Sequence, residues 1–346
     1  MNTLRWGILG TAAIARKNWK GIWHSGNSVL TAVASRTADR SREFVAQCQQ
    51  EKPFETIPAA LGSYEELLAA PDVDAIYIPI PTGVRKEWVV RAAEAGKHVL
   101  CEKPAASTVV EIREMIDACR RNRVQFMDGV MFMHNPRLDR IRNALHDATT
   151  FGEIRRITSH FSFLSNEDFR KTNVRSDSAL EPLGCVGDLG WYCIRLMLWT
   201  MNWELPREVS GRILSDARGE RSPGAVPFDF SAELLFDNNV SAGFYCSFLA
   251  AYSNWVVLTG TKGIVRVPDF VLPQKSSHGA LDINGIPSDD LTMDPLTAQE
   301  TNMVRTFATQ VLSGKLNNAW PEWALKTQIV ANACVDSAHA GRPICV

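Results

Sequence analysis

The sequence predicts two domains: an α/β domain with a doubly wound parallel sheet, then an α+β domain with a largely antiparallel sheet. Three observations predict this fold. Short apolar runs alternate with helical patterns in the N-terminal third of the chain, which is typical of parallel strands joined by helices. Strand patterns follow one another after Gly152. The 346 residues also exceed the length at which one core stops growing, roughly 250–300 residues. We therefore expect a first domain over 1–128 and a second over 129–346.

Strand and helix patterns alternate regularly in the first domain. The predicted strands are Leu4–Leu9, Val29–Ala34, Ala75–Ile80, His98–Cys101 and Val124–Met127. The predicted helices are Ile14–Trp23, Asp39–Gln49, Ser63–Ala70, Val84–Ala95 and Thr108–Asn122. Two of these helices begin with the spacing of a capping box, at Ser63 to Glu66 and at Thr108 to Glu111.

The second domain begins with a helix signal at Asn135-Pro136, a capping residue followed by proline. Its predicted strands are Glu153–Leu164, Phe228–Phe236, Val240–Phe248, Trp255–Thr259 and Ile264–Val267. Two turn sequences, Asp237-Asn238-Asn239 and Thr261-Lys262-Gly263, each separate two of these strands and predict hairpins. Helical patterns return at Thr297–Leu312 and Glu322–Ala340.

Composition excludes several classes of function. The 37 basic and 38 acidic residues leave a net charge of −1, so no long-range field favours nucleic acid or an anionic membrane. No apolar run is long enough to span a bilayer, and the N-terminus has no secretory pattern. The eight cysteines form no Cys-x-x-Cys pair. We therefore expect a cytoplasmic protein with reduced thiols and no bound metal.

A small-residue loop joins the first strand to the first helix. Gly10-Thr11-Ala12-Ala13-Ile14-Ala15 fits the G-x-G-x-x-[GA] dinucleotide fingerprint of the Rossmann fold, except for alanine at the middle position. Glycine at 10 permits a tight turn, and small residues at 12 and 15 allow close approach of a pyrophosphate and of the helix to the strand. A helix N-terminus then faces the phosphates. The alternative is a tight turn in a sheet that binds something else.

The end of the second strand bears on which dinucleotide is bound. A site for NAD usually carries Asp or Glu there, whereas this strand ends in Ser35-Arg36. Arg36 is suited to pair with a 2′-phosphate and to stack on adenine, and Ser35 to add a hydrogen bond. We therefore expect NADP(H), with NAD(H) not excluded. The alternative is a solvated arginine at a strand end.

A lysine follows the predicted strand His98–Cys101, in Glu102-Lys103-Pro104. Ligands of open parallel sheets gather at the carboxyl ends of the strands, so Lys103 is expected near the nicotinamide end of the cofactor. There it would hydrogen-bond substrate and ribose, and its charge would lower the pKa of a neighbouring acid. The alternative is an exposed loop lysine.

Three segments together resemble the Gfo/Idh/MocA oxidoreductase family. They are the loop at Gly10, the block from Ala95 to Pro104, and Gly187-Asp188-Leu189-Gly190-Trp191-Tyr192. The resemblance extends over nearly the whole chain. Its motifs are most similar to the branch that includes dimeric dihydrodiol dehydrogenase, NADP-dependent xylose dehydrogenase and glucose–fructose oxidoreductase.

The resemblance implies a set of site residues. Lys103 matches the family lysine that contacts substrate and ribose, while Asp188 and Tyr192 match an Asp and a His or Tyr on one face of a helix, where tyrosine serves as acid/base. It also implies cofactor contacts at Pro81, Thr82 and Glu102.

Further residues are weaker substrate candidates. They are Arg175, Arg195 and His134. For each arginine the alternative is a surface or structural salt bridge, and for His134 a packing or capping role.

Two departures from the family pattern argue against an inositol-type site. Arg195 stands where many inositol-type members carry an Asp, and Thr82-Gly83-Val84-Arg85 replaces the familiar Asn-x-x-His. The identity of the sugar or polyol therefore stays open.

The resemblance implies hydride transfer between NADP(H) and a sugar, polyol, dihydrodiol or related carbonyl, with Tyr192 exchanging the proton and Lys103 assisting. Because the family buries the open face of its antiparallel sheet in a homodimer, we expect a homodimer or a higher homo-oligomer. The alternative function is a dinucleotide-binding regulator or sensor without catalysis, which would not need both Lys103 and Tyr192.

Overall fold

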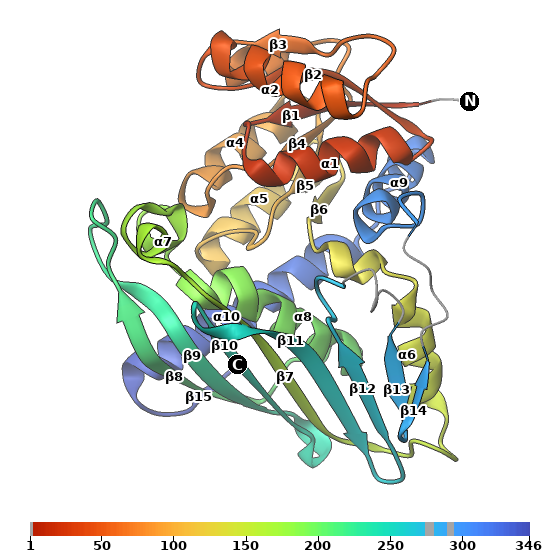
Figure 1. Cartoon of the computed structure of the whole chain (residues 1–346), viewed down its shortest axis with the longest axis vertical. Coiled ribbons are helices and arrows are strands. Elements are labelled where there is room, and N and C mark those ends of the chain that lie inside the picture. Colours follow the sequence, from red (N-terminus) through yellow and green to blue (C-terminus); the bar gives the residue numbers. More distant parts are fainter. Residues whose placement is uncertain (1–2, 274–279, 289–293) are drawn as a thin grey trace. The chain divides into compact units, whose positions relative to one another are not determined.

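The computed structural model describes residues 3–273, 280–288 and 294–346, which form two compact units (Figure 1). The first unit comprises residues 3–106, 110–135 and 294–324. The second comprises 107–109, 136–273, 280–288 and 325–346. Each unit is built around its own sheet.

The first unit contains a six-stranded parallel sheet in the order β3-β2-β1-β4-β5-β6. Its strands are β1 (Leu4–Leu9), β2 (Ser28–Ala34), β3 (Ala59–Leu61), β4 (Ala75–Ile78), β5 (His98–Cys101) and β6 (Phe126–Asp128). This is the strand order of a dinucleotide-binding Rossmann domain, so the predicted doubly wound sheet is confirmed. The sequence does not predict β3, a three-residue edge strand too short to show a period.

Helices connect these strands, as the alternating pattern predicted. They are α1 (Ala13–His24), α2 (Ala38–Glu51), α3 (Tyr64–Ala69), α4 (Thr82–Glu94) and α5 (Val109–Arg121), followed by a 3₁₀ turn η1 (Met131–His134). Half of the capping box predicted at Ser63 is present, because Ser63 Oγ accepts a hydrogen bond from the backbone N–H of Glu66 at 3.2 Å, while the Glu66 carboxylate accepts from Ser63 Oγ and from the N–H of Gly62. Gly96 ends α4 with a φ of 74°, a left-handed conformation that favours glycine.

One C-terminal helix packs with the first unit rather than with the second. Helix α9 (Gln299–Leu312) places Phe307 5.1 Å from the ring of Trp6 in β1. Arg305 Nε donates to the carbonyl of Ser25 at 2.9 Å. A Cβ on Gly21 of α1 would lie 3.1 Å from the Glu300 carbonyl, so the two helices approach closely. The division expected at residue 128 therefore differs from this grouping, because apolar contacts made by α9 return residues 294–324 to the first unit.

The second unit is built on a nine-stranded sheet in the order β14-β13-β12-β11-β7-β10-β9-β8-β15. Its strands are β7 (Ile154–Leu164), β8 (Glu208–Ala217), β9 (Val226–Leu235), β10 (Ser241–Ser247), β11 (Leu249–Gly260), β12 (Ile264–Pro268), β13 (Leu281–Ile283), β14 (Ile286–Ser288) and β15 (Ile344–Cys345). All neighbours pair antiparallel except β7 and β10, which are parallel. The predicted largely antiparallel sheet is confirmed.

Both predicted hairpins are also present. β9 and β10 flank η4 (Asp237–Asn239), where Asn238 and Asn239 adopt φ values of 61° and 59°. Asparagine tolerates this left-handed conformation better than most residues. β11 and β12 pair antiparallel on either side of the second predicted turn.

Helices cover one face of this sheet. The helical elements of the second unit are α6 (Arg137–His146), α7 (Glu167–Thr172), η2 (Val174–Ser176), η3 (Val186–Gly190), α8 (Trp191–Thr200) and α10 (Ala319–Ala340), whose first turns lie in the first unit. Gly190 packs on Phe244 and Cys246 of β10, and Gly211 of β8 approaches the Cys334 carbonyl of α10. None of the helices that the structure describes has the length and apolar character needed to cross a membrane.

Candidate functional site

The loop after β1 has the geometry of a phosphate cradle. Gly10 adopts a φ of 114°, and a Cβ there would lie 2.8 Å from Ile80 Cγ2, so both backbone and space require glycine. Helix α1 starts at Ala13, and Ala12 offers no side chain to cap its first N–H groups. Ala15 is fully buried, which allows the helix to pack closely on the sheet. A glycine turn that leads into a helix N-terminus without a side-chain cap is the arrangement that suits an anion such as a pyrophosphate.

Cationic and aromatic side chains gather beside this loop. Arg36 is exposed at the end of β2, directly after the buried Ser35. Burial raises the pKa of the Tyr64 phenol, while the charges of Arg36 and Arg40 oppose that rise. The Tyr64 hydroxyl would lie 3.8 Å from a Cβ on Gly10, which places the tyrosine and the arginines around one loop. The sequence did not single out Tyr64 or Arg40: Arg40 follows the predicted strand Val29–Ala34 by six residues, and Tyr64 follows the unpredicted strand β3.

A buried hydrogen-bonded chain surrounds Glu102 at the end of β5. Tyr77 Oη donates to Glu102 Oε1 at 2.6 Å, and Asn18 Nδ2 donates to Tyr77 Oη at 2.8 Å. The backbone N–H of Lys103 donates to Glu102 Oε2 at 3.1 Å. Burial raises the pKa of the Glu102 carboxyl, and the Tyr77 hydrogen bond and the Lys103 and Arg85 charges partly oppose this. Glu102 therefore fixes the backbone that presents Lys103.

The segment after β4 contributes buried groups to the same region of the first unit. Thr82 begins α4 and is 2% exposed, and Pro81 precedes it half-buried. Arg85 is 3% exposed and donates to the carbonyls of Ile80, Glu102 and Pro104. In the sequence Arg85 stands out only as a departure from a family pattern, because no local signal indicates that its partners lie 5 to 19 residues away.

In the second unit, Asp188 forms an ion pair with Arg175. Arg175 Nε lies 2.7 Å from Asp188 Oδ2, and the side chains are 40% and 13% exposed. The Asp188 charge is the largest cause that raises the pKa of Arg175, and an ionised Tyr192 adds to it. Tyr192 itself is 6% exposed, with its ring 5.9 Å from that of Phe161. Arg175, Asp188 and Tyr192 thus form one electrostatic cluster.

The helix that carries this cluster differs from the expected one. Asp188 lies in the π-helical turn η3 rather than in an α-helix, and Tyr192 follows in the first turn of α8. Gly190 allows this turn to sit against β10, where a Cβ would lie 3.2 Å from Phe244 and 3.3 Å from Cys246. Such turns occur often at functional sites.

The weaker candidates have structural contacts. Arg195 is 2% exposed, donates through Nε to Thr327 Oγ1 at 2.8 Å and lies over the ring of Trp203. The carbonyl of His134 accepts a hydrogen bond from Asn302 Nδ2 at 3.1 Å. The predicted substrate contacts of both residues stay predictions.

Other chemistry has little support among the described residues. Burial raises the pKa of the Cys101 thiol to about 12, which fits a packed thiol rather than a nucleophile. No group of three or more His, Cys, Asp or Glu residues within the described part of the chain has the arrangement of a metal site.

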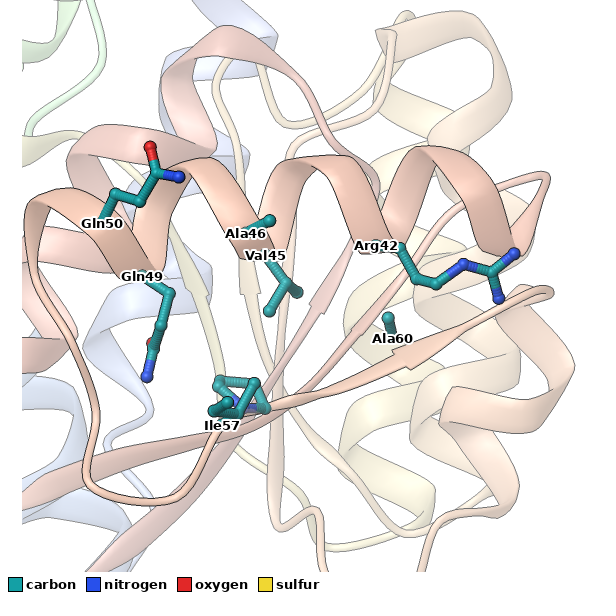
Figure 2. Close-up of a pocket in the computed structure, with 8 residues that line it drawn as sticks. Arg42, Val45, Ala46, Gln49, Gln50, Ile57 and Ala60 are labelled. Atoms are coloured by element: carbon teal, nitrogen blue, oxygen red, sulfur yellow. The ribbon is translucent and has the colours of Figure 1, made fainter.

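An apolar groove of about 380 Å³ lies elsewhere on the first unit, between α2 and the loop before β3 (Figure 2). Its lining residues are Arg42, Val45, Ala46, Gln49, Gln50, Ile57, Pro58 and Ala60. None of the predicted site residues lines it, so the groove is separate from the phosphate cradle and from the Glu102 chain.

Family models match both parts of the chain. Residues 4–130 match the family model described as an oxidoreductase family with an NAD-binding Rossmann fold, and residues 140–266 match the GFO/IDH/MocA C-terminal domain. The chain is 30% identical to trans-1,2-dihydrobenzene-1,2-diol dehydrogenase of Bos taurus, over 77% of this chain and 74% of that protein. It is 29% identical to D-xylose 1-dehydrogenase (NADP(+)) 2 of Haloferax volcanii, over 99% of both chains.

A solved structure shows the same fold over nearly the full length. KijD10, a 3-ketoreductase from Actinomadura kijaniata in complex with NADP and TDP-benzene, superposes with a TM-score of 0.83 at 25% identity. The match covers 97% of this chain and 98% of that one.

Proposed function

This chain belongs to the Gfo/Idh/MocA oxidoreductase family and is an NAD(P)-dependent oxidoreductase, and from this we propose a finer function. It transfers a hydride between NADP(H) and a sugar, polyol, dihydrodiol or related carbonyl or secondary alcohol. The observation that carries the proposal is the Gly10 cradle, where a Cβ would meet Ile80 at 2.8 Å.

Two features support NADP(H) over NAD(H). The exposed Arg36, with Arg40 nearby on α2, supplies cationic donors that suit a 2′-phosphate. The xylose dehydrogenase and the ketoreductase are both described with NADP, whereas a more distant match, a levoglucosan dehydrogenase at 16% identity, is described with NADH. Pro81, Thr82 and Glu102 would complete the cofactor contacts from the ends of β4 and β5.

The nicotinamide, when bound, supplies or accepts the hydride. Tyr192 exchanges the hydroxyl proton of the substrate, and Lys103 stabilises the phenolate and hydrogen-bonds the substrate oxygen. A free tyrosine titrates near 10, too high for an efficient base at neutral pH, and nearby cations favour its ionised form. Arg175 contributes in the same sense, since its interaction with an ionised Tyr192 is attractive. Asp188 holds Arg175 in place through the 2.7 Å ion pair.

The test combines binding and turnover. NADPH and NADH are titrated by fluorescence, and oxidation is followed on adding a panel of sugars, polyols and diketones. Tyr192→Phe and Lys103→Met should each reduce turnover by about 10²–10⁴-fold while leaving NADPH affinity within a few-fold. Normal turnover in both variants would remove Tyr192 and Lys103 from the mechanism.

The same experiment addresses the sensor alternative. Tight NADPH binding without oxidation across the whole panel favours a regulator. In that case the protein senses the concentration of the dinucleotide and transmits the signal through contacts with other proteins. Turnover on one member of the panel excludes that alternative and bounds the substrate class.

We also propose that the chain forms a homodimer through the open face of its nine-stranded sheet. Tyr245, His160 and Trp255 are register partners on β10, β7 and β11, and they form a half-buried aromatic row there. Beside this row, Arg156 forms a bidentate ion pair with Glu233 across the bare backbone of Gly243. A groove of about 410 Å³ on this face offers a surface that a second copy can cover. Analytical ultracentrifugation at micromolar concentration is expected to show a dimer, and a monomer contradicts the proposal.

A further inference from the structure

We propose that Arg85 is a positioning residue that clamps the Glu102–Pro104 segment and thereby fixes Lys103. This inference rests on the proposed role of Lys103 in binding substrate and cofactor. Arg85 belongs to the segment Thr82-Gly83-Val84-Arg85, which departs from the Asn-x-x-His pattern of the family. The inference therefore rests on the contacts that Arg85 makes in this chain.

The clamp is made by one guanidinium that joins three carbonyls. Arg85 Nε and Nη2 donate to the Ile80 carbonyl at 3.0 and 2.6 Å, at the end of β4. Arg85 Nη1 donates to the Glu102 carbonyl at 2.9 Å and also to the Pro104 carbonyl. Lys103 lies between these last two residues, so the chain is held immediately before and immediately after it.

The amide side of the same segment is held by Glu102. Its Oε2 accepts from the Lys103 N–H at 3.1 Å, and its Oε1 accepts from Tyr77 at 2.6 Å. Burial favours the neutral carboxyl, and the cation of Arg85 opposes this by lowering the pKa of Glu102. Arg85 therefore supports the Lys103 backbone directly through carbonyls and indirectly through the charge of Glu102.

Arginine is the side chain that this arrangement needs. A buried guanidinium is costly unless its donors are satisfied, and its planar fork presents five N–H groups in fixed directions. Lysine carries the same charge on a single nitrogen and cannot reach three carbonyls in those directions. Arg85→Lys thus separates the clamp from the charge.

The neighbouring residue on α4 is a matched control. Lys86 is also cationic, but it lies on the solvent side and pairs with Glu114 at 2.8 Å. Lys86→Met removes a charge from the same helix and leaves the carbonyl clamp intact.

The experiment measures Lys103 itself, independently of any substrate. Full-length wild-type protein, Arg85→Lys, Arg85→Met and Lys86→Met are acetylated briefly, and the rate at Lys103 is read by mass spectrometry against the exposed Lys17. The dissociation constant of NADPH is measured in parallel, and melting by circular dichroism confirms that each variant is folded.

Arg85→Lys is expected to fold, to acetylate Lys103 several-fold faster and to bind NADPH about tenfold more weakly, as expected for one or two lost hydrogen bonds. Lys86→Met is expected to match wild type in both measurements. A folded Arg85→Lys whose Lys103 rate and NADPH affinity equal those of wild type overturns the proposal, even if Arg85→Met fails to fold. Faster labelling without turnover on any substrate supports the clamp and instead counts against the proposed function.

Discussion

Two charged groups among the candidate site residues, one in each compact unit, are held in different ways. In the first, Arg85 and Glu102 are 3% and 8% exposed, and their bonds go largely to backbone and to the buried Tyr77. In the second, Arg175 is 40% exposed and its partner is a carboxylate at 2.7 Å. A buried charge bonded to carbonyls fixes geometry, because breaking it leaves an unsatisfied group in a dry interior. The Arg175–Asp188 pair, whose side chains are 40% and 13% exposed, instead sets the charge beside Tyr192, and because Arg175 keeps contact with solvent, breaking the pair costs less than breaking a fully buried one.

Within the first unit, two glycines with a positive φ differ in the space around them. Gly10 and Gly26 both adopt a positive φ in the first unit, at 114° and 79°. A Cβ on Gly10 would meet Ile80 at 2.8 Å, whereas a Cβ on Gly26 would meet nothing within 4 Å. Backbone strain is therefore common to both positions, and the clash is particular to the cradle.

The largest expected effect follows from this pair. Gly10→Ala should abolish NADPH binding at attainable concentrations, a loss of at least about 100-fold, because the cradle must move to admit the methyl group. Gly26→Ala should lose about 1 kcal/mol of unfolding free energy, from the left-handed backbone, and keep its NADPH affinity. Fluorescence titration and urea unfolding measure the two quantities. NADPH affinity that stays normal in Gly10→Ala would show that the dinucleotide lies elsewhere.

A smaller effect is expected at the half-exposed pair of the second unit. Arg175→Met leaves the Asp188 charge without its counter-ion beside Tyr192, which disfavours the phenolate. Turnover should fall about tenfold and the midpoint of its pH profile should move to higher pH, since a lost cation makes the phenol harder to ionise. Arg175→Lys should restore part of the rate. Melting temperature should change little in either variant, in contrast to the buried Arg85, and a large loss of stability would contradict the comparison.

The smallest expected effect tests a partly exposed pair in the first unit. Arg5 lies 2.6 Å from Asp74, with side chains 43% and 32% exposed, and the Arg5 hydrogen bond is the main cause that lowers the pKa of Asp74. A carboxyl whose pKa is lower in the folded state stabilises the protein above its unfolded pKa, near 3.9, and that contribution is lost as pH falls through the folded pKa.

Asp74→Asn should therefore lose about 1 kcal/mol or less near neutral pH, after allowance for solvent screening. The difference from wild type should shrink below pH 4, as followed by urea unfolding across pH 3–7. If the difference in unfolding free energy between wild type and Asp74→Asn instead grew toward acid pH, the pKa of Asp74 would not be lowered by folding and the prediction would be wrong.

Much of the first unit could be predicted because its signals are local. A turn that must pass through a positive φ needs glycine at 10, and parallel strands place whatever follows them at one edge of the sheet. That reasoning identified the glycine turn of the loop, and its predictions of site roles for Arg36 and Lys103 stay predictions. It missed β3 and Tyr64, since a three-residue strand and a single aromatic residue show no period.

The site residues of the second unit were less accessible to such reasoning. The spacing of Asp188 and Tyr192 identified the pair only through resemblance, and the π-helical turn that carries Asp188 depends on how Gly190 packs against β10. Arg175 was a weak candidate until its ion pair with Asp188 was seen, because 13 residues separate them and no helical period relates them.

The sequence by itself determined the alternation of strands and helices in most of the first unit, both hairpin turns and the glycine of the cradle, because each follows from backbone conformation within a few residues. It did not predict β3, the ten-residue strand β8 or the short strands β13, β14 and β15. Tertiary structure decided the rest. It brought α9 against β1, paired Arg175 with Asp188 and directed Arg85 to carbonyls 17 and 19 residues away. Burial gives these contacts their strength, and burial is a property of the packed chain rather than of any segment of it.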